Sequence, residues 1–334
     1  MAIFRTKTQW ILLLGFLVIL FLAPLYVNDT ILTVITLIGI TIISLHGLNI
    51  LTGRCGLISM GHSGFMMVGG YASAILAAKV GVPFWAALPA AGLIAGLVGI
   101  IFGLPSLKIK GFYLIMATVA AYFIIHWVVL QLQAVTGGTN GLPIPKATLF
   151  DINLNTKTNF FYVVMVILVI ATYAAKNIMR TRAGRAFVAI RDNDLAAEVM
   201  GVNLWNYKLQ AFFIGCVFAG VAGALSVQYI RFANIDQFPF MDSVWFLGML
   251  IVGGIGSTTG VIFGVIALKL LDQLAIQIGP ALVTVFHFQP TAGAAVSLIL
   301  SGLIIILFLI FEPHGIEHFW ERIKSYYRLW PFSS

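Results

Sequence analysis

The chain has 334 residues, of which 60% are hydrophobic and only 9% are charged, and its mean hydropathy is +1.03. A water-soluble domain carries about a quarter charged residues, so this composition excludes a soluble protein. It predicts an all-α polytopic membrane protein with a single transmembrane domain over 1–334, in contact with lipid. The formal net charge of +8 does not indicate nucleic-acid binding, because the basic residues are scattered between apolar runs.

Apolar runs long enough to cross about 30 Å of hydrocarbon follow one another from 10 to 311. The first run follows Arg5 and Lys7, and we interpret it as an uncleaved span. The region 242–278 is too long for one span and is broken at 253–260 (GGIGSTTG), so we expect a helix, a tight turn and a second helix. The total is about ten crossings. Besides the region 242–278, the runs that each predict one crossing are 10–27, 31–51, 57–79, 83–104, 112–134, 159–178, 209–230 and 291–311.

The basic residues predict an orientation. If the N-terminus lies in the cytoplasm and the chain crosses ten times, fourteen basic residues face inward and four face outward. This asymmetry is the one that the positive-inside rule describes. We therefore expect a multi-pass protein of the cell (inner) membrane with both termini in the cytoplasm, including the tail 312–334.

The longest charged segment lies between Lys176 and Lys208 and holds six of the nineteen basic residues. Within it, the stretch 195–201 (LAAEVMG) predicts a short helix that a glycine ends. We interpret 194–202 as a cytoplasmic docking helix, with the small side chain of Ala197 facing a partner. The alternative is that this basic loop between two spans is only an orientation signal.

The segment 47–71 is dense in glycine and carries polar side chains inside an apolar zone. Irregular backbone is tolerated at membrane depth only where it is buried or lines a watery cavity. Two interpretations stay open: a broken helix that lines a pore, or Ser and His side chains that only bond neighbouring helices. The candidate residues of the path, from this segment and the later glycine-rich break, are Ser59, His62, Ser63, Gly69, Gly70, Gly253, Gly254 and Ser257.

The two halves of the chain share a short stretch of weak internal sequence similarity. The stretch 66–71 (MMVGGY) resembles 250–255 (LIVGGI), so each half contains a glycine-interrupted apolar segment. Such pairs are typical of inverted repeats with a translocation site between them. Gly-Gly is also common in packed membrane helices, and this similarity by itself is not specific.

Several classes of site are missing from the sequence. There is no G-x-x-x-x-G-K-[ST] phosphate loop and no H-E-x-x-H motif, and Cys55 and Cys216 match no metal spacing. We expect neither an enzyme nor a chain that binds a cofactor or metal itself. Lys269 and Asp272 stand three residues apart in a presumed helix, where they form either a structural pair or a proton relay.

Seven stretches in order resemble one known family, the LivM-type permeases of branched-chain amino-acid ABC importers. The resemblance covers roughly 47–316. The stretches are GLISMGHSGF at 56–65, KIKGFYLIMAT at 108–118, TGGTNGLP at 136–143, RAGRAFVAIRDNDLAAEVMGV at 182–202, AGVAGAL at 219–225, VGGIGSTTG at 252–260 and FEPHGI at 311–316.

The resemblance implies a transport subunit that pairs with a LivH-type permease, two cytoplasmic ATPases that carry ATP and Mg, and an extracytoplasmic substrate-binding protein. The solute would be a branched-chain amino acid or a similar small polar molecule. An ion-coupled transporter acting alone, with Asp272 as its intramembrane acid, and a purely structural subunit are the alternatives. The candidate residues for coupling to the ATPases are Arg185, Arg191, Asp194, Ala196, Ala197, Glu198 and Gly201.

Overall fold

The computed structural model describes residues 26–107, 109, 111–145, 148–149, 152–153 and 156–285, with isolated residues at 21, 24, 299, 302–303, 306, 310 and 315–318. Within them, eight helical segments are long and apolar enough to cross a membrane. The predicted all-α polytopic fold is therefore confirmed. The predicted spans 10–27 and 291–311 and the tail 312–334 lie largely outside the described residues.

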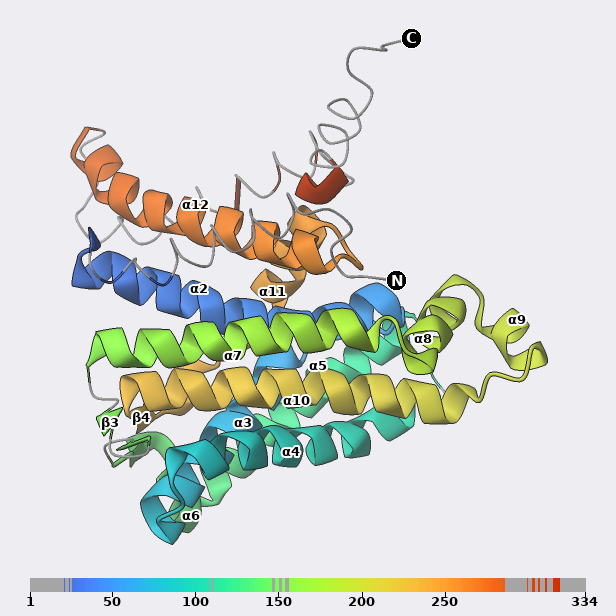
Figure 1. Cartoon of the computed structure of the whole chain (residues 1–334), viewed down its shortest axis with the longest axis horizontal. Helices are drawn as coiled ribbons and strands as arrows, with labels where there is room; N and C mark the ends of the chain where they lie inside the picture. Colours follow the sequence, from blue (N-terminus) through green and yellow to red (C-terminus); the bar gives the residue numbers. More distant parts are fainter. Residues whose placement is uncertain are drawn as a thin grey trace.

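The structure contains eight long helices among its described residues. They are α2 (Asp29–Leu48), α3 (His62–Ile75), α4 (Phe84–Gly103), α5 (Phe112–Gln131), α7 (Lys157–Ile178), α10 (Leu204–Ile230), α11 (Phe240–Gly253) and α12 (Thr258–Val285). Helices α2, α4, α7, α10 and α12 run side by side, roughly along one axis (Figure 1). The predicted break in 242–278 is confirmed, since α11 ends at Gly253 and α12 begins at Thr258.

Short elements join and extend these helices. The π-helical turns η1 (Asn49–Arg54) and η2 (Leu76–Val80) extend α2 and α3, and the 3-10 turns are η3 (Leu104–Leu107), η4 (Gly138–Asn140) and η5 (Ile235–Gln237). The short helices are α6 (Gln133–Thr136), α8 (Arg182–Asp192) and α9 (Asp194–Val199). Strand β1 (Leu142–Pro143) pairs antiparallel with β4 (Phe232–Ala233), and β2 (Thr148–Leu149) pairs with β3 (Ile152–Asn153).

Helix α10 lies at the centre of the bundle and packs against α2, α3 and α4. Small residues allow this close packing, as is usual between membrane helices. A Cβ atom added to Gly69 of α3 would lie 2.2 Å from the Cα atom of Gly220 in α10. The two backbones are therefore in direct contact, and a larger residue at either position would separate them.

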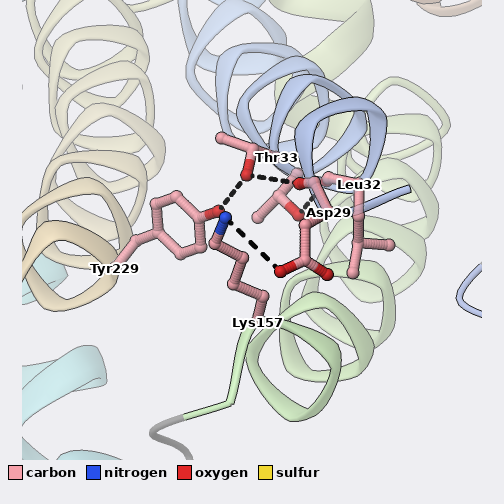
Figure 2. Close-up of polar contacts among 6 residues, drawn as sticks. Asp29, Leu32, Thr33, Lys157 and Tyr229 are labelled. Carbon is pink, nitrogen blue, oxygen red and sulfur yellow. Dashed lines mark hydrogen bonds and ion pairs between the residues drawn. The ribbon is translucent and has the colours of Figure 1, made fainter. Parts of the chain in front are cut away.

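The bundle has two different ends. Helices α8 and α9 lie at one of them, here called the loop end, and the short strands lie at the other, here called the strand end (Figure 1). At the strand end the Tyr229 hydroxyl donates to Thr33 Oγ1 at 3.0 Å, and Lys157 Nζ lies 3.8 Å from Asp29 Oδ2 (Figure 2). These contacts join the starts of α2 and α7 to the end of α10.

The contacts at the two ends test the predicted alternation of crossings. At the strand end, Lys79 after α3 also donates to the carbonyl of Ala134 after α5. At the loop end, Arg191 donates to the carbonyl of Gly53 at 3.1 Å. Lys79 and Lys157 therefore lie at one end and Arg191 lies beside η1 at the other, as the alternation predicts. The number of crossings stays a prediction. Which end faces the cytoplasm stays a prediction.

The contact at Gly69 gives the first testable prediction. Gly69→Leu would force a side chain into the contact between α3 and α10, and overpacking costs about 1–3 kcal/mol. We expect less folded subunit after purification in detergent and a lower unfolding temperature. Ala120→Leu is the control, because Ala120 is exposed on α5. Equal unfolding temperatures for both variants would contradict the packing of α3 on α10.

Candidate translocation and coupling sites

Helix α3 begins inside the bundle. After η1 the chain turns back without regular structure over 56–61, and the amide of Met60 donates to Thr118 Oγ1 at 3.0 Å. His62 Nε2 then lies 3.0 Å from the carbonyl oxygen of Ser44 in α2. Ser44 stands ten residues before Arg54, where η1 ends, which is about 15 Å along a helix. The start of α3 is therefore well inside the loop end.

Helix α11 also begins inside the bundle and runs in the opposite direction. Its first residue, Phe240, packs against Tyr122 with ring centroids 5.4 Å apart, and Tyr122 lies in the middle of α5. The 14 residues of α11 span about 21 Å, and they end at the loop end. Helix α3 runs from the same region toward the strand end.

Two serines join the starts of these interrupted helices. The amide of Ser63 donates to Ser243 Oγ at 2.9 Å, and the two hydroxyls lie 2.8 Å apart. The first amides of any helix have no partner within that helix, so Ser243 satisfies a donor that α3 leaves open. Both side chains are fully buried.

Two buried polar atoms beside this contact have no hydrogen-bond partner among the described residues. They are Ser59 Oγ and His62 Nδ1. An unsatisfied buried polar group costs about 1–3 kcal/mol, so such groups mark a place of functional interest. Ser59, His62 and Ser63, which the sequence singled out, are thus brought together in the interior of the bundle.

The other predicted path residues lie elsewhere. Gly69 and Gly70 lie further along α3, where α10 and Phe238 approach the backbone. Gly253, Gly254 and Ser257 form the turn between α11 and α12 at the loop end. The structure therefore distributes the predicted path over three places, and whether solute touches them stays a prediction.

Sequence reasoning missed Ser243 and its neighbour Asp242. The apolar run beginning at 242 placed both at the edge of a span, whereas the interrupted start of α11 places them inside. Asp242 is partly buried and interacts electrostatically with Lys269 of α12. The available signal in the sequence was an acidic residue, Asp242, at the start of an apolar run. Asp242 is therefore a second acid, besides Asp272, within the apolar region.

The predicted docking segment is held firmly by helix α8. Its residues Phe187 and Ile190 are buried, and the Phe187 ring packs edge-on against Tyr207 of α10 at 6.3 Å. The side chain of Thr181 accepts from the amide of Gly184 and caps the start of the helix. Helix α8 is thus part of the bundle rather than a free loop.

The predicted helix ended by a glycine is confirmed as α9, and Gly201 just beyond it has φ +83°. The prediction that Ala197 faces outward is wrong, because this side chain is only 5% exposed. It packs against the chain itself, and a small residue is needed there for that reason. The large exposed residues of α9 and its end are apolar: Leu195 is 67%, Val199 is 87% and Met200 is 83% exposed.

The remaining predicted coupling residues divide into two groups. Arg185, Ala196 and Glu198 are exposed. Asp194 and Arg191 contact the bundle instead, since Asp194 Oδ2 lies 4.0 Å from Nζ of the buried Lys208 in α10. Arg191 donates to the carbonyl of Gly53 and to the Asp192 carboxylate.

A cavity of about 370 Å³ lies between this loop and the bundle. Burial raises the pKa of the Cys55 thiol at its wall to about 12, and the nearby Lys208 cation opposes the shift only in part. Cys55 therefore stays protonated at neutral pH. Other lining residues are Leu57, Leu114, Ile190, Arg191, Asp192, Asp194 and Lys208.

The fold and these sites define a class. A multi-pass helical bundle with two interrupted helices meeting at buried polar groups is the architecture of a membrane transport protein. The family described as the permease component of branched-chain amino acid transport systems matches residues 30–309, and the chain belongs to it. It is thus a transport component and not an enzyme.

Relatives from bacteria and an archaeon agree with this family. The chain is 30% identical over 335 aligned positions to the high-affinity branched-chain amino acid transport system permease protein LivM of Escherichia coli K12, covering 93% of this chain and 75% of that protein. It is 26% identical to a probable LivM of Methanocaldococcus jannaschii, covering 68% and 66% of the two chains. No solved structure matches the chain.

The two native thiols give the second prediction. Cys55 and Cys216 are both buried, and Cys55 is protonated near neutral pH. We expect a maleimide reagent at pH 7 to label the native protein at neither residue, and to label both after denaturation. Mass spectrometry of digested protein measures this. Rapid labelling of Cys55 in the folded protein would contradict the burial of the 55–61 segment.

Proposed function

We propose that this chain is a permease subunit of an ATP-driven importer of branched-chain amino acids or a similar small polar solute. It forms the path with a LivH-type permease and receives solute from an extracytoplasmic binding protein. Two cytoplasmic ATPases carry the ATP and Mg. The observation that carries the proposal is α9, which presents Leu195, Val199 and Met200 to the outside of a charged loop.

The chain needs such a surface because it has no phosphate loop of its own. Energy from ATP must then reach it by contact, and a short rigid helix seated in a partner's groove can transmit a domain movement as a rigid body. Exposed apolar side chains are the anchors that such helix-in-groove contacts use. Ala197 and Asp194 face the bundle and attach α9 to it.

The start of α3 and the start of α11 provide the path. Two interrupted helices that run in opposite directions from one region are typical of transporters built from inverted repeats. Ser59 Oγ and His62 Nδ1, which have no hydrogen-bond partner within the described ranges of the chain, supply polar groups to a passing solute. We place the narrowest part of the path beside Ser63 and Ser243.

A second candidate, an ion-coupled transporter acting alone, is favoured by one observation. Asp242 lies at the interrupted start of α11, and intramembrane acids commonly bind coupling ions. Lys269 interacts with this carboxylate and opposes that use. The two functions differ in their energy source, which the following experiment varies.

Our third prediction concerns the exposed face of α9. Val199→Glu places a charge in the contact with an ATPase, and an unpaired buried charge costs about 3 kcal/mol or more. We expect the ATPases to dissociate on purification and ATP-dependent uptake into proteoliposomes to be lost. Val80→Glu is the matched control, because Val80 is also exposed but lies at the strand end.

The outcomes separate the candidates. Normal co-purification of the ATPases with Val199→Glu would mean that the loop is only an orientation signal. Uptake by the chain alone, driven by an ion gradient and lost in Asp242→Asn, would favour the secondary transporter.

The fourth prediction concerns orientation. Met200 follows α9 at the loop end, and Val80 ends η2, where the neighbouring Lys79 donates to Ala134 at the strand end. Both side chains are exposed, and the native thiols are buried. A membrane-impermeant thiol reagent should label Met200→Cys only in inside-out vesicles and Val80→Cys only in right-side-out cells. The reverse pattern would overturn the cytoplasmic placement of α9 and the orientation derived from the basic residues.

A further inference from the structure

The side chain of Asn49 joins the π-helical turn η1 to the turn between α11 and α12. Its Nδ2 donates to the carbonyl of Ser257 at 3.0 Å, and its Oδ1 accepts from the amide of Gly256 at 2.8 Å. Both atoms of the amide are thus engaged with the turn between α11 and α12. Asn49 itself is buried at the first position of η1.

The same π-helical turn also contacts helix α8, which directly precedes the docking helix α9. Arg191 Nη1 donates to the carbonyl of Gly53, also in η1, at 3.1 Å. The Asp192 carboxylate accepts from Arg191 Nε at 3.0 Å and from Nη2 at 2.9 Å. These two bonds fix the orientation of the planar guanidinium, so that Nη1 points at the carbonyl of Gly53.

Gly53 of η1 also lies directly against the turn between α11 and α12. A Cβ atom on Gly53 would lie 2.6 Å from the amide nitrogen of Gly256. A Cβ atom on Gly256 would lie 3.1 Å from the Gly53 carbonyl oxygen and 3.5 Å from Arg191 Nη1, so Arg191, η1 and the α11–α12 turn meet at one place. Such π-helical turns inside helices are rare and occur frequently at functional sites.

Helix α11 extends from this turn to the start of α3. Its last residue is Gly253, and Ser243 in its first turn bonds Ser63. A helix of this length is rigid compared with the turns at its ends. A displacement of the α11–α12 turn therefore moves Ser243 against Ser63.

We propose that Asn49 is a positioning residue that couples the docking loop to α11. Movement of α9 passes through α8 and Arg191 to η1, through Asn49 to the α11–α12 turn, and along α11 to the Ser63–Ser243 contact. This inference rests on the proposed function, because it assigns a route to the energy that the ATPases supply through α9.

A second connection exists and must be distinguished. Asp194 in α9 also pairs with Lys208 in α10. Helix α10 is continuous over 27 residues and packs along α3 and α4, so this pair attaches α9 to the bundle as a whole. Of these two connections, the contacts of Asn49 are the ones that end on the α11–α12 turn.

The test uses the complete complex in proteoliposomes, with leucine as solute and with ATP hydrolysis and uptake measured in the same preparation. In Asn49→Ala we expect the complex to assemble and hydrolysis stimulated by the binding protein to persist. Uptake per ATP should fall roughly tenfold, which corresponds to about 1.4 kcal/mol of coupling. Asn206→Ala is the control, because Asn206 is an exposed asparagine at the start of α10.

A double variant tests whether Asn49 and Arg191 act in one route. If they do, Asn49→Ala with Arg191→Ala should be no worse than the more severe single variant, since residues in one network are not additive. Independent losses that multiply would overturn the proposal. Arg191 lies in α8 and is exposed whereas Asn49 is buried, so Arg191→Ala still tests the route if Asn49→Ala does not fold.

A distance measurement tests the movement itself. Spin labels at Met241 in α11 and Leu97 in α4 report α11 against the bundle, and both side chains are exposed. We expect this distance to change with ATP in the parent complex and in Asn206→Ala, and to stay constant in Asn49→Ala while hydrolysis continues.

Three results for Asn49→Ala would overturn the inference. They are an uptake per ATP equal to that of the parent complex, a loss of hydrolysis together with uptake, or a movement of α11 with ATP as large as in the parent complex. Failure of the proposed function looks different. In that case the unsubstituted complex itself would show no ATP-dependent uptake.

Discussion

Inside a bilayer every backbone donor and acceptor must find its partner within the protein, yet two helices of the described part of the chain, α3 and α11, begin inside the bundle. The contact between Ser63 and Ser243 satisfies a backbone donor at one of these helix starts, because the Ser243 hydroxyl of α11 accepts from the amide of Ser63 in α3. It also makes each interrupted helix depend on the other. A change in the position of α11 cannot leave the start of α3 unaffected, and the interior of the bundle is thereby connected to its ends.

The two ends use different chemistry for different purposes. At the strand end, Thr33, Tyr229, Asp29 and Lys157 join three helices through polar contacts that water can reach, and exposed pairs of this kind contribute little stability. At the loop end, Arg191, Asn49 and the turn at Gly256 form a buried or half-buried set of hydrogen bonds. The loop end therefore has the more specific geometry, and it is also the end with an exposed apolar helix.

The position of Ala197 shows how a small residue can be misread. Alanine in a short helix permits close approach, but its size does not say which surface approaches. The exposed large side chains of α9 lie beside it, and Ala197 lies against the chain's own bundle. The same pattern therefore serves two contacts: large apolar side chains available to a partner, and a small one that keeps α9 near α8 and α10.

The sequence by itself determined the membrane class, the described spans, the break between α11 and α12 and the end of α9 at Gly201. These features depend on apolar length and on the local conformation of glycine, which neighbouring residues set. Only the tertiary structure decided that α3 and α11 begin inside the bundle, that Ser243 bonds Ser63, that Ala197 faces inward and that Asn49 contacts Gly256. The three hydrogen-bonded contacts made by Arg191, Ser63 and Asn49 join residues 138 to 208 positions apart. Helical periodicity carries no information about such pairs, because packing between helices brings them together.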